Sequence, residues 1–260
     1  GLWVMATSSS ATSASPMEVD LNTTATALSA EVASTPSRPY ARSWVNVLTS
    51  WFERLPGPTW LAYVGAMVIG VLLSAVSQGA LGVVAIVYYG ALPFAILGLI
   101  HRLDRAAGQA LRSVRPLLQV DETGVAGMHY QLTVVPARPA ALLALAAIVV
   151  TPLGYVLDPV GSGIVGLSAE QLLVRDAAES FVAALFVVLV YHTIRQLRLI
   201  GRVHEGIKRI DVFAQGPLYT LSRVTSMTAL GFVLLLVPSV FLIPPNADVP
   251  YIVITAAWYG

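Results

Sequence analysis

Long apolar runs separated by short polar stretches dominate the chain from residue 59 onward. A helix needs about 20 mostly apolar residues to cross the hydrocarbon core of a bilayer, and five of the runs have roughly that length. The pattern predicts an all-α fold, a polytopic membrane bundle of about six spans in three antiparallel hairpins. The predicted spans are roughly 59–78, 80–100, 139–157, 179–197, 224–243 and a shorter run, 249–260, that we expect to be truncated.

The first 41 residues follow a different pattern. Ser, Thr and Ala dominate them, and no basic residue occurs before Arg38. Such a stretch cannot bury enough apolar surface to offset the loss of chain entropy on folding. We therefore expect residues 1–41 to form a disordered tail.

Residues 42–58 are predicted to form a separate amphipathic element. Apolar side chains recur there at three- and four-residue steps, which places them on one face of a helix. Two tryptophans and flanking arginines suit a helix lying in the headgroup region of a membrane. The alternative is a helix docked on another part of the same protein. The apolar positions are Trp44, Val47, Leu48, Trp51, Phe52 and Leu55.

Small residues repeat every four positions in the first predicted span. Ala62, Ala66, Gly70 and Ser74 form this seam. Small side chains at that spacing let a second helix backbone approach closely, and such packing drives helix association in lipid. The second helix belongs either to the same hairpin or to another copy of the chain, and we favour the same hairpin.

Two longer polar segments lie between the predicted spans. In the first, 101–138, we expect an amphipathic helix ending near Pro116, a turn at residues 121–124, and a strand or extended piece from His129 to Val135. In the second, the fourth span should continue as one helix of about 35 residues down to Phe213, where Gly216 and Pro217 stop it.

Charge fixes the orientation of this pattern. Fourteen of the fifteen Lys and Arg residues lie on one side of the predicted spans, and only Arg175 lies on the other. Basic residues near membrane spans are retained on the cytoplasmic face. The hydrophobic fraction of 56% and charged fraction of 11% are also those of a membrane protein. We therefore expect a transmembrane domain over residues 59–260, in the cell membrane, with a cytoplasmic N-terminus.

No pattern in the sequence indicates catalysis, a cofactor or a metal. Cysteine is absent, and the histidines His101, His129, His192 and His204 lack metal-ligand spacing, so we expect them to be solvated at the inner surface. Residues 161–166 have the spelling of a dinucleotide loop, but the strand and helix that this motif requires are missing. We expect no enzyme activity and no nucleic-acid partner.

The strongest candidate for binding is a basic stretch around the inner end of the fourth span. Basic residues close to a membrane surface attract anionic lipids. The alternative is that these charges only set the topology. The candidate lipid contacts are Arg195, Arg198, Arg202, Lys208 and Arg209.

These observations favour a membrane anchoring, sensing or scaffold module that forms the N-terminal part of a longer protein. Its partners would be the lipid bilayer, anionic lipids, and either a second copy of the chain or an additional C-terminal domain. The alternative function is a small-solute transporter or channel component, with a site among helices kinked by Pro93, Pro152 and Pro238.

Overall fold

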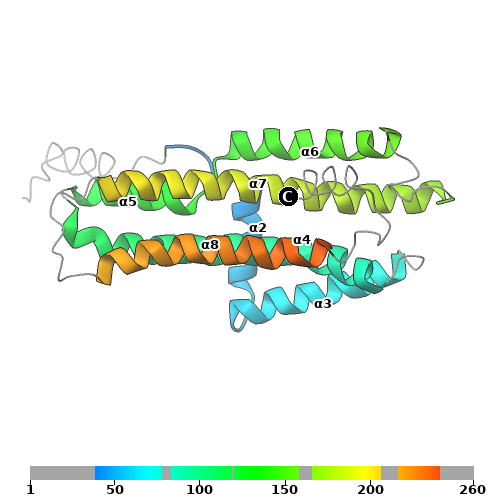
Figure 1. The fold of residues 1–260 in the computed structure, drawn as a ribbon, viewed down its shortest axis with the longest axis horizontal. Helices are drawn as coiled ribbons and strands as arrows, with labels where there is room; N and C mark the ends of the chain where they lie inside the picture. The colour runs from blue at the N-terminus through cyan, green and yellow to red at the C-terminus, as the bar shows by residue number, and fades with distance from the viewer. Residues whose placement is uncertain (1–38, 78–82, 119, 158–165, 206–215, 241–260) are drawn as a thin grey trace, which may run out of the picture. The chain divides into compact units, whose positions relative to one another are not determined.

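The computed structural model describes residues 39–77, 83–118, 120–157, 166–205 and 216–240 (Figure 1). Contacts divide the chain into residues 1–37 and 38–260, and the fold described below belongs to the second unit. Within the described ranges all regular secondary structure is helical, which confirms the predicted all-α class. The predictions for the tail up to residue 38, for residues 161–165 and for the last span lie outside the described residues.

The helices are long and connected mainly as antiparallel neighbours. In chain order they are α2 (Trp44–Arg54), α3 (Thr59–Ser77), α4 (Val83–Val114), the 3₁₀ turn η1 (Arg115–Leu117), α5 (Glu122–Thr133), α6 (Ala137–Leu157), α7 (Ala169–Glu205) and α8 (Gly216–Val240).

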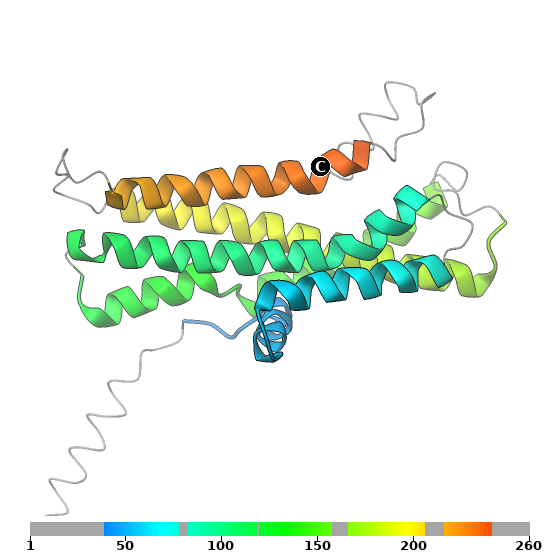
Figure 2. The same cartoon turned by 90° about the horizontal axis from the view of Figure 1, so that it is seen from below.

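Helix α4 is the centre of the arrangement. It contacts α2, α3, α5, α7 and α8, whereas α6 packs mainly against α7. Figures 1 and 2 show the long helices running side by side, with α5 and α6 at opposite ends of α7 and the short α2 lying across their direction. The two hairpins α3–α4 and α6–α7 are those predicted from the apolar runs.

Two apolar clusters hold the helices together, one toward each end of α4. The first includes Ile100 and Leu103 of α4 and Leu189 of α7. The second begins one turn further along α4, at Ala107, and about three turns further along α7, at Leu199. Both helices therefore carry an apolar face, an interruption that is shorter on α4 than on α7, and an apolar face again.

The strand predicted from His129 is wrong, because this segment continues a helix. The carboxylate of Asp121 caps α5 by accepting from the backbone N–H of Gly124 at 3.0 Å. A capped helix start overrides a weak alternation of seven residues. Only the β-branched end of the segment is extended, where the carbonyl of Val135 accepts from the N–H of Ser43 at 3.1 Å.

Helix α2 docks on the bundle through only part of its predicted apolar face. Phe52 is buried and stacks on Tyr63 of α3, with ring centroids 4.5 Å apart. Val47 and Trp51 are 61% and 55% exposed. The helix turns by 109° into α3. The sequence left two positions open for this helix, in the headgroup region of a membrane or docked on the same protein. The helix does dock, and its exposed Trp51 remains compatible with a position in the headgroup region.

The long helices begin earlier than predicted. Helix α7 starts at Ala169 and is described to Glu205, and α8 starts at Gly216 with Pro217 in its first turn. Proline lacks a backbone N–H and suits the start of a helix, so Gly216 and Pro217 begin α8. Residues 39–41, which the sequence assigned to the tail, are among the described residues, and the backbone carbonyl of Ala41 accepts from the N–H of Ala137 at 3.1 Å.

One described helix, α6, is long and apolar enough to cross a membrane, with a mean hydropathy of 2.3 over its best window. The bent pair formed by α2 and α3 would count as a second span. The described residues therefore do not confirm a six-span bundle. In α4 and α7 the apolar and charged stretches share one continuous helix.

The structure places the small-residue seam of α3 toward α4. Ser74 is buried, and Ala62, Ala66 and Gly70 are partly buried. A Cβ added at Gly70 would collide with the backbone carbonyl oxygen of Gly90 and lie 2.7 Å from Cε2 of Phe94. The two glycines therefore bring the backbones of α3 and α4 into direct contact.

This contact predicts that Gly70→Ala lowers thermal stability. The added methyl group forces the backbones apart, at a cost of about 1–3 kcal/mol. Gly65→Ala on the same helix is the matched control, because a Cβ there meets nothing within 4 Å. Melting temperatures of both variants in detergent test the prediction, and equal values would show that α3 and α4 do not pack through Gly70.

Candidate functional site

A polar chamber of about 500 Å³ lies between α2, α4 and α5. Its lining is rich in charged and hydrogen-bonding side chains, which is unusual for a packing defect between helices. The lining residues are Arg42, Asn46, Thr49, Ser50, Glu53, His101, Asp104, Arg105, Gly108, Gln109, Arg112, His129, Thr133 and Val134.

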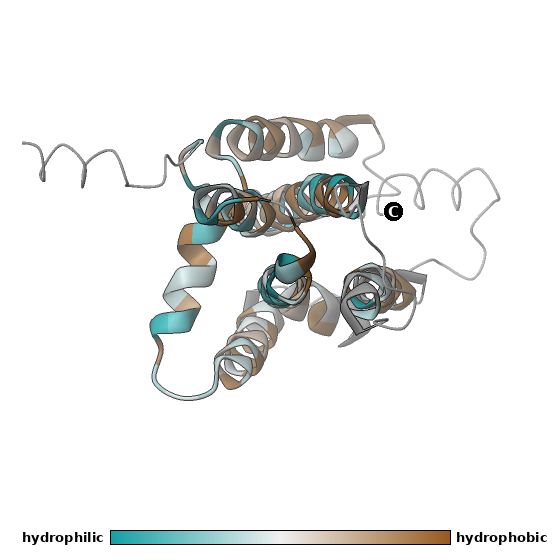
Figure 3. Ribbon diagram, turned by 90° about the vertical axis from the view of Figure 1, so that its left-hand side faces the viewer, coloured by the Kyte–Doolittle hydropathy of each residue, from teal (hydrophilic) through white to brown (hydrophobic). Residues whose placement is uncertain are grey.

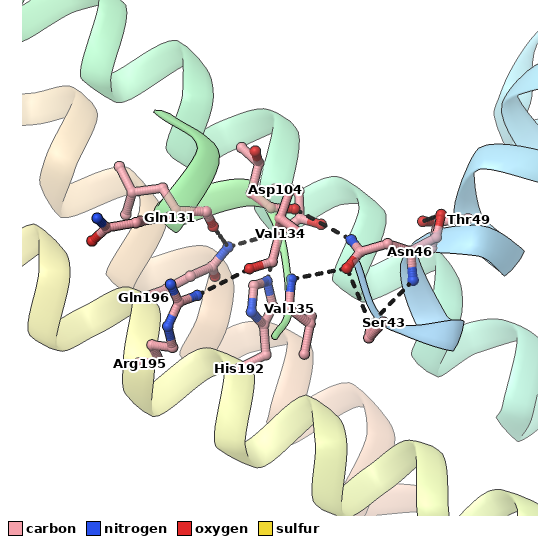
Figure 4. A network of polar contacts seen from close by, with 12 residues as sticks. Ser43, Asn46, Thr49, Asp104, Gln131, Val134, Val135, His192, Arg195 and Gln196 are labelled. Atoms are coloured by element: carbon pink, nitrogen blue, oxygen red, sulfur yellow. Dashed lines mark hydrogen bonds and ion pairs between the residues drawn. The ribbon is translucent and has the colours of Figure 1, made fainter. Parts of the chain in front are cut away.

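The carboxylate of Asp104 connects this chamber to helix α7 (Figure 4). Its Oδ1 lies 2.6 Å from Nε2 of His192 and accepts from Nε2 of Gln196 at 2.8 Å. The same Gln196 amide donates to the backbone carbonyl of Leu132 at 2.8 Å. These contacts join α4, α7 and the end of α5 in one network.

The network lies in the interruption between the two apolar clusters. The His192 side chain is 0% exposed and that of Asp104 is 13% exposed. Burial raises the pKa of Asp104, while His192 and the Gln196 hydrogen bond act in the opposite direction. A buried carboxylate is costly without partners, so the two α7 side chains are what makes its position tolerable.

The geometry also indicates the tautomer of His192. Its Nδ1 is buried and has no hydrogen-bond partner among the described residues. An unpaired buried N–H donor is rarer than an unpaired acceptor. Of the two tautomers of the ring, the one with its proton on Nε2, which donates to Asp104, therefore satisfies the site best. Because the ring is inaccessible, His192 cannot reach a solute in the chamber, and Asp104 is the member of the pair that lines it.

Asn46 organises the other wall of the chamber. Its Oδ1 accepts from the backbone N–H of Val135 at 2.8 Å, and its Nδ2 donates to the carbonyl of Thr133 at 3.4 Å. Ser43, the N-cap of α2, donates to the same Oδ1 at 3.1 Å. One side chain thus fixes the start of α2 against the end of α5.

Some of the charged side chains that line the chamber have an oppositely charged partner among the described residues, and others do not. Glu53 lies 3.7 Å from Nδ1 of His101 and 3.6 Å from the Arg105 guanidinium. Burial and the nearby Arg105 lower the pKa of His101. Arg42 and Arg112 have no acidic partner within the described part of the chain. The chamber therefore carries an excess of positive charge.

The predicted lipid contacts are not equivalent in the structure. The Arg195 guanidinium points inward, donates to the carbonyl of Val134 at 3.1 Å and to the Tyr40 hydroxyl, and covers the Tyr40 ring. Arg198 and Arg202 are exposed. Lys208 and Arg209 lie outside the described residues. Arg195 thus serves to fix the N-terminal segment on α7.

The predicted solvation of the histidines is wrong for two of them. His101 and His192 are buried, at the level where each long helix leaves its first apolar cluster. The sequence did contain one indication of this site, because His192 and Gln196 are four residues apart and therefore share a helix face. Their partner Asp104 lies 88 residues from His192, so no local pattern could identify it.

Comparisons with known proteins returned no family model, no curated protein and no solved structure that matches the chain. Within the described ranges, no group of three His, Asp or Glu side chains has a geometry that could hold a metal ion.

The Asp104 network predicts a large difference between two substitutions. Asp104→Ala removes the acceptor of His192 and one of the two acceptors of the Gln196 amide, and it should lower the free energy of unfolding by about 3 kcal/mol. Asp104→Asn should cost much less, because its amide oxygen can still accept both hydrogen bonds. Thermal unfolding of the two variants measures the difference.

The control for this comparison is Glu122→Ala, which removes a side chain that is 89% exposed and forms an ion pair with Arg115. Surface ion pairs of this kind contribute little to stability. Equal melting temperatures for Asp104→Ala and Asp104→Asn would contradict the assigned network.

Proposed function

We propose that the chain is a multi-pass membrane module that anchors and senses, with its N-terminus and the charged end of its bundle in the cytoplasm. The observation that carries the proposal is the position of the polar chamber. It lies beside α4, at the level where an apolar-surfaced half of the bundle, with exposed aliphatic side chains, meets a half with exposed arginines.

The apolar-surfaced half exposes large aliphatic side chains on several helices. Only 17% of the apolar window of α6 is buried, whereas a core helix of a water-soluble protein is mostly buried. In Figure 3 the topmost helix, α6, is largely apolar. The exposed side chains of this half include Leu61, Val64, Val68, Ile69, Leu72, Leu142, Leu145, Ile148, Leu153, Val156, Leu230, Val233, Leu234 and Val237.

The lengths of the central helices fit a partly embedded bundle. Helices α4 and α7 have 32 and 37 residues. At 1.5 Å per residue they extend about 48 and 55 Å, compared with about 30 Å of hydrocarbon. Each would therefore cross the bilayer and continue well beyond it.

Helix α2 supports the same boundary. It lies across the direction of the long helices (Figure 1) and is linked to the start of α6 through Ala41 and Ala137. Trp51 projects from it to the outside. An amphipathic helix in this orientation, with an exposed tryptophan, suits the interfacial region of a bilayer.

Sensing is proposed because the chamber couples elements that would otherwise be independent. A solute held there would touch α2, α4 and α5 and lie beside the Asp104 link to α7. Its binding would favour one relative position of these helices over others. The excess of arginines among the lining residues suits a small anionic solute such as a carboxylate or a phosphate ester.

The orientation predicts which positions can be labelled from outside intact cells. Because the chain has no cysteine, single substitutions are specific. Ser113→Cys and His204→Cys at the charged end should be protected from an impermeant maleimide. Glu170→Cys, exposed at the start of α7, should react.

Permeabilised cells provide the control, since all three cysteines should then react. Labelling of Ser113→Cys and His204→Cys in intact cells, with Glu170→Cys silent, would reverse the topology. Equal labelling of all three would contradict a membrane-spanning arrangement.

A further inference from the structure

A second, smaller cavity of about 210 Å³ lies between α4 and α8, on the other side of Arg105 from the polar chamber. Three arginines line it, together with small and apolar side chains and two neutral polar ones. We call it the arginine groove. Its lining residues are Arg102, Arg105, Ala106, Gln109, Ala110, Thr220, Arg223, Val224 and Met227.

The groove is strongly positive. None of its lining residues is acidic. Arg102 and Arg223 form no ion pair among the described residues, and Arg105 reaches Glu53 at 3.6 Å only on the chamber side. Three guanidinium groups around one small cavity repel each other. An anion placed between them would remove that repulsion and satisfy several N–H donors at once.

The position of the arginines along the helices specifies the kind of anion. Arg102 and Arg105 directly follow the apolar stretch of α4, and Arg223 directly precedes that of α8. Because α4 and α8 pack together, the three lie at one level, beside the exposed aliphatic surface of Leu230 and Leu234. This is the level at which a bilayer would place its inner phosphate groups.

We propose that the arginine groove binds the phosphate of an anionic phospholipid, with the acyl chains along the apolar surface of α8. Guanidinium groups bind phosphate through paired N–H donors, which gives geometric as well as electrostatic selectivity. The inference rests on the proposed membrane function. It names a site distinct from the basic face of α7 that the sequence indicated.

The test compares the parent chain with Arg102→Gln/Arg223→Gln in nanodiscs that contain phosphatidylglycerol and phosphatidylcholine. Native mass spectrometry of the released protein reports which lipid is retained. The parent should retain phosphatidylglycerol preferentially, and the double variant should lose that preference by roughly tenfold or more. Arg102→Lys/Arg223→Lys should retain an intermediate preference, because it keeps the charge without the paired donors.

Arg198→Gln/Arg202→Gln is the matched control, because it removes two exposed arginines from α7 and leaves the groove intact. It should behave as the parent. Equal phosphatidylglycerol retention by the parent and the groove variant would overturn the assignment, as would a larger loss in the α7 control. A melting temperature within about 2 °C of the parent's confirms that the groove variant is folded.

Two further measurements distinguish a failure of the lipid site from a failure of the proposed membrane function. If millimolar inorganic phosphate displaces phosphatidylglycerol from the parent, the groove is a site for the free anion and the lipid assignment is wrong. If the parent chain is recovered outside the membrane fraction of cells, the proposed membrane function fails and the lipid site fails with it. Membrane recovery with unselective lipid retention overturns the groove alone.

Discussion

The hydrogen bonds of the Asp104 carboxylate are the constraint on which the arrangement of the helices depends. A carboxylate this deep between helices has to find donors, and both come from α7, through His192 and Gln196. Because Gln196 also holds the end of α5, a rotation or a one-turn slip of α7 past α4 would leave three buried polar groups unpaired. The apolar clusters on either side can tolerate such slips more easily, since aliphatic contacts are not directional. The polar layer therefore fixes the register, and the apolar clusters supply most of the attraction.

The same layer marks the level at which the surface of the molecule changes. Beyond it in one direction the helices present aliphatic side chains, and in the other they present arginines. The chamber, the crosswise α2 and the arginine groove all lie near this level. Arg105 lines both cavities, so an anion in the groove and a solute in the chamber would compete for one guanidinium. A membrane module that responds to a cytoplasmic solute would need such a connection between its lipid-facing and water-facing parts.

The sequence predicted those features that depend on local periodicity. The all-α class, the helices that form the first two hairpins, and the small-residue seam containing Gly70 follow from spacing along a single helix. The failures have two physical causes. The strand expected from His129 failed because capping by Asp121, a signal outside the segment, decided its conformation. The chamber was missed because it depends on pairs such as Asp104 with His192, which only the packing of α4 against α7 brings together. The inward position of Arg195 likewise depends on the distant Tyr40.

The most direct test of the account is the depth profile of nitroxide labels attached to single cysteines in nanodiscs. Collision with oxygen reports hydrocarbon, and collision with a water-soluble nickel chelate reports water. The account predicts high oxygen and low nickel accessibility at Leu145, Ile148 and Leu234, and the reverse at Arg112 and His204. The crossover should fall at the level of Ser50 and His101, where α2 lies across the bundle. High nickel accessibility along all of α6, or a crossover beyond Arg112, would contradict a bilayer boundary at the polar layer.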